Sequence, residues 1–191
     1  MKIKAFYLLL LLPLFLCVFG YQSNNETDKI YWNNSRKLTW EDFKGIPILE
    51  SPHGAGTACG LDYKNELRND SVVFFAKCFF QIKESWVKEK DKTDKLLAHE
   101  QLHFDIAEIF ARKFRKELSK YSHSKKNVNA LFKSMASKYG KQKGIMQCQY
   151  DKETKNSQME SKQIEWEIKI EKELKELKEF EASIVKVKLK K

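Results

Sequence analysis

One long apolar pattern constrains the fold of this chain more than any other feature. Between residues 93 and 121, apolar side chains recur at steps of three and four positions: Leu96, Ile106, Phe110, Phe114 and Leu118. Such a stripe covers one face of an α-helix and has to pack against a core. Thr93 or Asp94 is a suitable N-cap residue, and we expect the helix to end near Ser119 or Tyr121.

The predicted helix carries His99, Glu100 and His103 in the form H-E-x-x-H. The two histidines lie one turn apart on one face, so both imidazoles can reach a single ion. Zinc suits imidazole nitrogen, and a catalytic zinc needs three protein ligands and a water, whose pKa it lowers to about 7. Glu100 can accept the proton of that water as it attacks a carbonyl. The alternative is two half-buried histidines that continue the apolar stripe without a metal.

The motif supplies two ligands, and the third has to come from another part of the chain. No glycine follows His103, so the helix does not turn back as it does in H-E-x-x-H-x-x-G-x-x-H enzymes. Asp105 and Glu108 lie about 160° and 140° round the helix from His103, out of reach of the same ion. We expect these two carboxylates to form salt bridges or to orient other groups. His53, in the loop "SPHGAG", is one candidate ligand, whereas His123 is expected on the surface.

Two strand patterns precede the motif helix, at residues 57–64 and 71–82, with the polar run "NELRND" as a hairpin loop. Symmetry about Arg68 and Asn69 gives three opposing pairs: Cys59 with Cys78, Leu61 with Ala76, and Tyr63 with Phe74. All six side chains then share one face, because side chains alternate along a strand. Cys59 and Cys78 either form a disulfide or remain two buried thiols.

Two further helices and a last strand are expected around this framework. Residues 127–147 form a weaker helical pattern in which Gly140 and Gly144 bend or break the helix, and residues 158–182 form an amphipathic C-terminal helix. The end, "SIVKVKLKK", alternates like a strand and either closes the sheet edge or frays. Leu38, Trp40 and Phe43 should plug an edge of the core. The predicted fold class is therefore α+β, with a small antiparallel sheet packed against the motif helix and two others.

The N-terminus has the pattern of a secretory signal peptide over residues 1–20, with early lysines, an unbroken apolar run and a terminal glycine. The apolar run is shorter than the roughly 20 residues of a membrane span. A lipoprotein signal would attach lipid at Cys17, but such a signal normally has a small residue before the cysteine, and Leu16 is bulky. We expect an exported protein, periplasmic or extracellular, without a transmembrane span after cleavage. Residues 21–37 are expected to be a flexible lead, and residues 38–191 a single monomeric domain.

The distribution of charge along the chain argues against a nucleic-acid partner. The formal net charge is +10, but the lysines are scattered among glutamates and form no arginine-rich stripe between aromatic residues. This pattern is typical of a solvated basic surface. We therefore expect no nucleic-acid partner.

Several segments together resemble the bacterial domain-of-unknown-function family 922, whose members are described as secreted zinc-dependent proteases. They are "LLAHEQLHFDIAE", "WEDFKG", "SWV" and "YDKET", followed by Gln163 and Trp166. The similarity covers about residues 38–166. It implies a zincin-like exported hydrolase, in which a helix bearing H-E-x-x-H holds the zinc.

The resemblance also directs attention to the block "YDKETKNS" for the missing ligand. Where other members often have a histidine, two positions after the threonine, this chain has Asn156, a poor zinc ligand. The resemblance then favours Asp151 as the third ligand, with Glu153 behind it, and Tyr150 as a donor to the oxyanion. The alternative for Asp151 is a helix cap in a loop before the third helix.

These patterns lead to one main functional hypothesis and two alternatives. The main one is a secreted zinc metallohydrolase, a peptidase with His99, His103 and Asp151 as ligands and Glu100 as general base. The second is a catalytically degenerate zincin-like module that acts by interaction in the cell envelope. The third is an exported structural protein in which the motif helix only packs.

Overall fold

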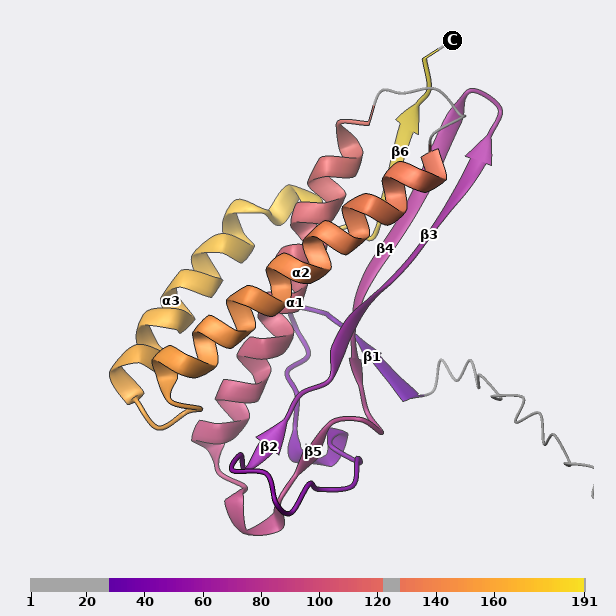
Figure 1. Cartoon of the computed structure of the whole chain (residues 1–191). Coiled ribbons are helices and arrows are strands. Elements are labelled where there is room, and N and C mark those ends of the chain that lie inside the picture. The colour runs from indigo at the N-terminus through magenta and orange to yellow at the C-terminus, as the bar shows by residue number, and fades with distance from the viewer. Residues whose placement is uncertain (1–27, 122–127, 191) are drawn as a thin grey trace, which may run out of the picture.

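The computed structural model describes residues 28–121 and 128–190 of the chain. The predicted signal peptide and His123 lie outside these residues. Figure 1 shows a small sheet with the three helices on one side of it. The α+β class, with an antiparallel sheet and three helices, is therefore confirmed.

A long hairpin forms the centre of the sheet, with β3 (Cys59–Arg68) paired to β4 (Ser71–Gln81). Arg68 is opposite Ser71, so the turn contains only Asn69 and Asp70. Asn69 has a φ of 47°, a left-handed conformation that asparagine tolerates better than most residues. The predicted six-residue loop is therefore wrong, because residues 65–68 continue the strand.

The short turn also changes the predicted register. Cys59 lies opposite Phe80, and Leu61 lies opposite Cys78. The pairing is shifted by two residues from the expected one, and an even shift keeps each side chain on its predicted face. The two thiols are not opposite each other, and neither forms a disulfide.

Two short strands share the other edge of β4. β1 (Lys29–Tyr31) pairs with residues 79–81, and β6 (Ile184–Lys188) pairs with residues 71–75. The prediction of a flexible lead is wrong for β1, which is held in the sheet by backbone hydrogen bonds. The prediction that the C-terminal strand closes the sheet edge is confirmed.

The motif helix α1 (Asp94–Ser119) packs on the sheet and on both other helices, α2 (Val128–Thr154) and α3 (Glu160–Glu176), and α2 also contacts β3 and β4 through Phe132. Its N-cap is Thr93, whose side chain accepts a hydrogen bond from the backbone N–H of Leu96. The predicted helix and cap are confirmed. Its apolar face is buried, and Ile106, Phe114 and Leu118 are fully enclosed in the core.

Helix α2 runs two turns beyond its predicted end and contains both Gly140 and Gly144 without a break. Each glycine costs the helix about 0.5–1 kcal/mol relative to alanine. The packing of Phe132, Tyr139 and Tyr150 into the core offsets this cost. As a result, the block that contains Asp151 is helical.

A second, smaller core cluster closes the end of the sheet next to the motif. It contains Leu38 and Phe43, with Trp40 packed against it, so these residues fill the core edge as predicted. A two-stranded sheet of β2 (Ala55–Gly56) and β5 (Trp86–Val87) contributes Ala55 and Val87 to this cluster.

A buried ion network ties α1 to the end of α3. Glu108 accepts hydrogen bonds from Arg112 and Arg115, and all three side chains are almost fully enclosed. Arg112 also donates to the backbone oxygen of Leu174, at 2.8 Å. The prediction that Glu108 forms salt bridges is confirmed. None of the helices within the described residues is both long and apolar enough to span a bilayer.

Candidate metal centre

The fold brings His99 and His103 of α1 to Asp151, in the last turn of α2. Their ligand atoms all lie within 4.8 Å of one another. Asp151 Oδ1 is 3.2 Å from His99 Nε2 and 2.9 Å from His103 Nε2. Ligands on a tetrahedral zinc, with bonds near 2.0 Å, are separated by about 3.3 Å. The three side chains therefore form a group that could hold a metal ion.

The hydrogen-bonding groups around His99 also favour a cation at this point. His99 Nδ1 is 3.3 Å from the side-chain oxygen of Gln163, and His99 Nε2 faces the carboxylate of Asp151. A neutral imidazole has one N–H and can donate to only one of these two oxygens. A proton or a metal ion between Nε2 and Asp151 satisfies both contacts.

Glu100 has a buried carboxylate oxygen with no hydrogen-bond partner. The residue is 3% exposed, and it lines the same cavity as the two histidines. Its Oε2 is the one buried side-chain polar atom without a partner among the residues that the structure describes. Leaving such a group unsatisfied costs about 1–3 kcal/mol. A water held beside the three ligands would donate to this oxygen, so the residues present fit a metal with a bound water.

Interactions with the two histidines keep the Asp151 carboxyl group ionised, which is the form that can bind a metal. Burial raises the pKa of Asp151, but hydrogen bonds from His103 and His99 lower it more, and the net pKa lies well below the usual range. Burial lowers the pKa of His103, but the hydrogen bond to Asp151 and the charge of Glu100 more than reverse this, so the net pKa is raised. Asp151 is thus ionised near neutral pH, and a metal has to compete with a proton at His103.

Tyr150 and Gln163 fix the orientation of His99. The Tyr150 ring stacks on the His99 ring, with centroids 4.5 Å apart. The Tyr150 hydroxyl donates to Gln163 Oε1 at 2.7 Å, and the same oxygen faces His99 Nδ1. A carbonyl that accepts from the remote nitrogen of a ligand histidine directs the other nitrogen to the metal. Gln163 therefore completes the site from α3, a role that the sequence did not indicate.

The prediction that Tyr150 donates to an oxyanion is wrong. Its side chain is fully buried, its hydroxyl is bonded to Gln163, and it does not line the cavity. The reason is the unexpected length of α2. Residues 150 and 151 are about 100° apart on a helix, so Asp151 faces the histidines while Tyr150 packs beneath them.

The other candidates for the third ligand lie outside the group. Glu153 accepts hydrogen bonds from Trp166 Nε1 and Gln149, and it is not among the three clustered ligands. His53 and Asn156 line the cavity but do not belong to this cluster either. The helix-cap alternative for Asp151 is wrong, because Asp151 lies inside α2 and the N-cap of α3 is Met159.

A left-handed turn joins α2 to α3 at the edge of the site. Lys155, Asn156 and Ser157 have φ values of 48°, 51° and 71°. The backbone N–H of Asn156 donates to the backbone oxygen of Asp151, at 2.9 Å, and so ends α2 just beyond the ligand. No glycine marks this turn, so it could not be predicted from the usual sequence signal of a helix end.

The candidate centre opens into a cavity of about 800 Å³. Residues 52–57 form one wall of it, and α2 contributes Gly144, Gln147 and Cys148. Gly56 packs on Trp86, where an added Cβ would lie 3.0 Å from the indole nitrogen. This volume is typical of a binding pocket for a small ligand or a peptide segment.

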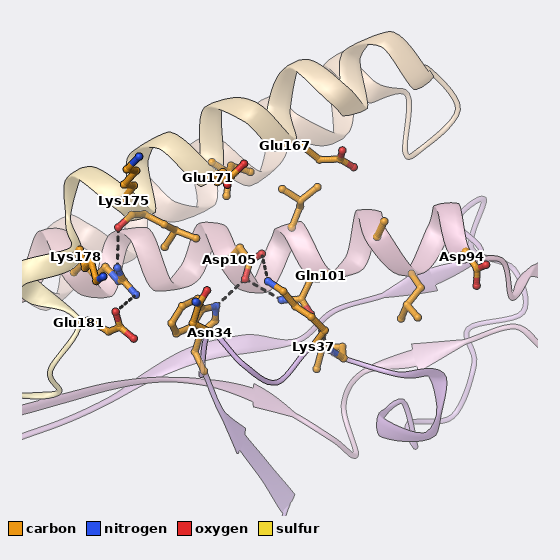
Figure 2. Close-up of a pocket in the computed structure, with 18 residues that line it drawn as sticks. Asn34, Lys37, Asp94, Gln101, Asp105, Glu167, Glu171, Lys175, Lys178 and Glu181 are labelled. Atoms are coloured by element: carbon orange, nitrogen blue, oxygen red, sulfur yellow. Dashed lines mark hydrogen bonds and ion pairs between the residues drawn. The ribbon is translucent and has the colours of Figure 1, made fainter.

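A second cavity of about 900 Å³ lies on another side of α1, between α1, α3 and residues 32–38. Figure 2 shows its charged rim and the bonds of Asp105 in its centre. Asp105 accepts from Trp32 Nε1 at 2.7 Å and from Gln101 at 2.9 Å, and Lys37 is 3.6 Å away. Because its polar centre is already paired and none of the three clustered ligands lines it, we assign the chemistry to the first cavity.

Comparison of the chain with family models, with curated proteins and with solved structures gives no match. The resemblance to family 922 therefore stays a prediction. The function has to be inferred from the site itself.

Proposed function

We propose that the protein is a zinc-dependent peptidase of the zincin-like type, with His99, His103 and Asp151 as the zinc ligands. The observation that carries this proposal is the buried, unpartnered Oε2 of Glu100, a residue that lines the same cavity as the three converging ligand residues. Two imidazoles and one carboxylate are a common donor set for catalytic zinc. The motif helix on a small sheet and the resemblance to family 922 support the same assignment.

Bound zinc supplies a Lewis acid that activates a water near neutral pH. Glu100 would act as the general base through Oε2, taking a proton from the attacking water and returning it to the leaving amine. Gln163 and the Tyr150 ring hold His99 in place throughout. The N-terminal pattern supports action outside the cytoplasm, and a polypeptide is the expected partner.

The cavity wall favours a polypeptide substrate over a bulky folded ligand. Residues 54–56 form one side of the cavity, where Gly54 packs on Asp91 and Gly56 packs on Trp86. Polar side chains without charge, including Thr57, Asn156 and Gln158, line much of the remaining surface. Groups of this kind suit the amide groups of a peptide.

The first experiment is to measure zinc per chain by elemental analysis. We expect about one zinc in the wild type, and loss of most of it in His103→Ala and Asp151→Ala. Glu153→Ala is the matched control, because it removes a nearby carboxylate that does not join the group. Glu100→Gln should keep zinc and lose hydrolysis of a labelled unfolded protein.

Three results would contradict the proposal or a part of it. A wild-type protein that binds no zinc after reconstitution would exclude the metal centre. Zinc binding without turnover of any peptide would instead support the degenerate zincin-like module. Retained hydrolysis in Glu100→Gln would exclude Glu100 as the general base.

A further inference from the structure

Three large apolar side chains stand exposed in one short loop beside the candidate centre. Ile46, Ile48 and Leu49 expose 90%, 53% and 75% of their surface. Single exposed apolar residues are common, but adjacent ones form a patch that usually contacts another molecule. The loop is therefore a candidate interaction surface.

The backbone of this loop is held in place while its apolar side chains face outward. The N–H of Gly45 donates to the backbone oxygen of Ser85 at 2.8 Å, and an added Cβ at Gly45 would meet that oxygen at 2.8 Å. The N–H of Ser51 donates to the backbone oxygen of Ile48, and Lys88 Nζ donates to the backbone oxygen of Ser51. Both ends of the loop are thus fixed, so binding through its side chains requires little new ordering.

The loop continues directly into the wall of the cavity. Pro52, His53 and Gly54 line the cavity together with His99 and Asp151. Leu49 is three residues before Pro52, so their Cα atoms are at most about 11 Å apart. An extended polypeptide covers that distance in about three to four residues.

We propose that Ile46, Ile48 and Leu49 bind an apolar stretch of an extended polypeptide substrate whose adjoining residues enter the cavity. The inference rests on the proposed function, because the substrate has to enter the neighbouring cavity. A lipid surface fits this loop less well. Lys44, Glu50 and Lys88 are the charges at the loop, and charges of both signs do not form the lysine and arginine cluster that binds an anionic bilayer.

Binding can be measured without catalysis, on metal-free protein that carries Glu100→Gln. The probe is a fluorescein-labelled peptide of about twelve residues with leucine at alternate positions, followed by fluorescence anisotropy. A second peptide has serine in place of every leucine. The test variant is Ile46→Ser/Ile48→Ser/Leu49→Ser. The matched control is Ile164→Ser/Ile168→Ser, which removes apolar side chains of α3 that are 50% and 64% exposed.

We expect the leucine peptide to bind and the serine peptide not to bind. The loop variant should bind the leucine peptide at least about tenfold more weakly, and the α3 control should bind it like the parent. Thermal unfolding checks that both variants are folded. Equal binding by the parent and the loop variant, or no binding by either, would overturn the proposal.

Two further arms separate this inference from its alternatives. Co-sedimentation with phosphatidylcholine and phosphatidylglycerol vesicles tests whether the loop binds membranes. A loop variant that loses vesicle binding but still binds the leucine peptide like the parent would overturn our assignment. Zinc content is measured on the same proteins without Glu100→Gln. A loop effect in a protein that binds no zinc would refute the peptidase while leaving the peptide-binding surface intact.

Discussion

Removal of the Gln163 side-chain carbonyl should weaken zinc binding although Gln163 is not a ligand. Gln163 Oε1 is 3.3 Å from His99 Nδ1 and accepts from the Tyr150 hydroxyl at 2.7 Å. In Gln163→Leu, His99 loses the acceptor that fixes its tautomer and ring orientation. Loss of such a partner typically costs 10- to 100-fold in metal affinity, which is about 1.4–2.7 kcal/mol.

The same substitution should also destabilise the metal-free protein. It leaves the buried Tyr150 hydroxyl with only the backbone oxygen of His99, 3.3 Å away. An inadequately bonded buried hydroxyl costs about 1–3 kcal/mol. Two controls separate orientation from stability. Gln163→Glu keeps an acceptor for His99 and should bind zinc at least as tightly as the wild type. Tyr150→Phe should lose stability while keeping its zinc affinity.

Zinc affinity is measured by competition with a chromogenic chelator near neutral pH, and stability by urea unfolding of the metal-free protein. The reasoning predicts weak binding in Gln163→Leu and near-normal binding in both Gln163→Glu and Tyr150→Phe. If Gln163→Leu binds zinc as tightly as the wild type, the carbonyl does not orient His99. If Tyr150→Phe loses as much affinity as Gln163→Leu, the effect is a general loss of packing.

Two other predictions follow from buried groups. Glu108→Ala should lower the free energy of unfolding by about 3–5 kcal/mol, because it leaves Arg112 and Arg115 buried without their carboxylate partner. Urea unfolding measures this change, and a loss below about 1 kcal/mol would contradict the prediction. The Cys148 thiol is exposed, whereas Cys78 is buried, and burial raises the pKa of its thiol well above the ordinary value. A disulfide-exchange reagent should therefore modify Cys148 rapidly and Cys78 only on unfolding. A fast reaction that persists in Cys148→Ser would refute this assignment.

The elements set by local signals were predicted well from the sequence. The Thr93 cap and the apolar stripe are both contained within the helix they define, and α1 begins and ends where they indicate. The alternation at the C-terminus likewise predicts β6. Patterns of this kind need no knowledge of the remaining chain, because the helix or strand itself determines which residues face the core.

The hairpin register could not be read in the same way. The residues from 65 to 68 are polar and look like a loop, but this end of β3 is only half covered, so polar side chains are compatible with a strand there. A turn of two residues rather than six then decides the register. The turn has no Asn-Gly or Asp-Gly pair, the strongest sequence signal for such a hairpin.

The site was predictable only in its local part. His99, Glu100 and His103 follow from one motif on one helix, whereas Asp151 was reached through the resemblance to family 922. The predicted role of Tyr150 was wrong because the end of α2 could not be located from the sequence. On a helix, a shift of one position decides whether a side chain faces the cavity or the core. Contacts between helices far apart in sequence depend on packing that no single segment encodes.

The site requires the packing of all three helices at once. Helix α1 supplies two ligand atoms, α2 supplies the third with the stacked Tyr150 ring, and α3 supplies the acceptor for His99. The far end of α3 is held to α1 by Arg112 and by the ion pair of Lys113 with Glu173. Because a metal binds the assembled ligands more tightly than the separated ones, site occupancy and the docking of α2 and α3 on α1 are linked, and each stabilises the other. By anchoring α3 to α1 at Leu174, the buried ion network helps to keep the three helices packed as the site requires.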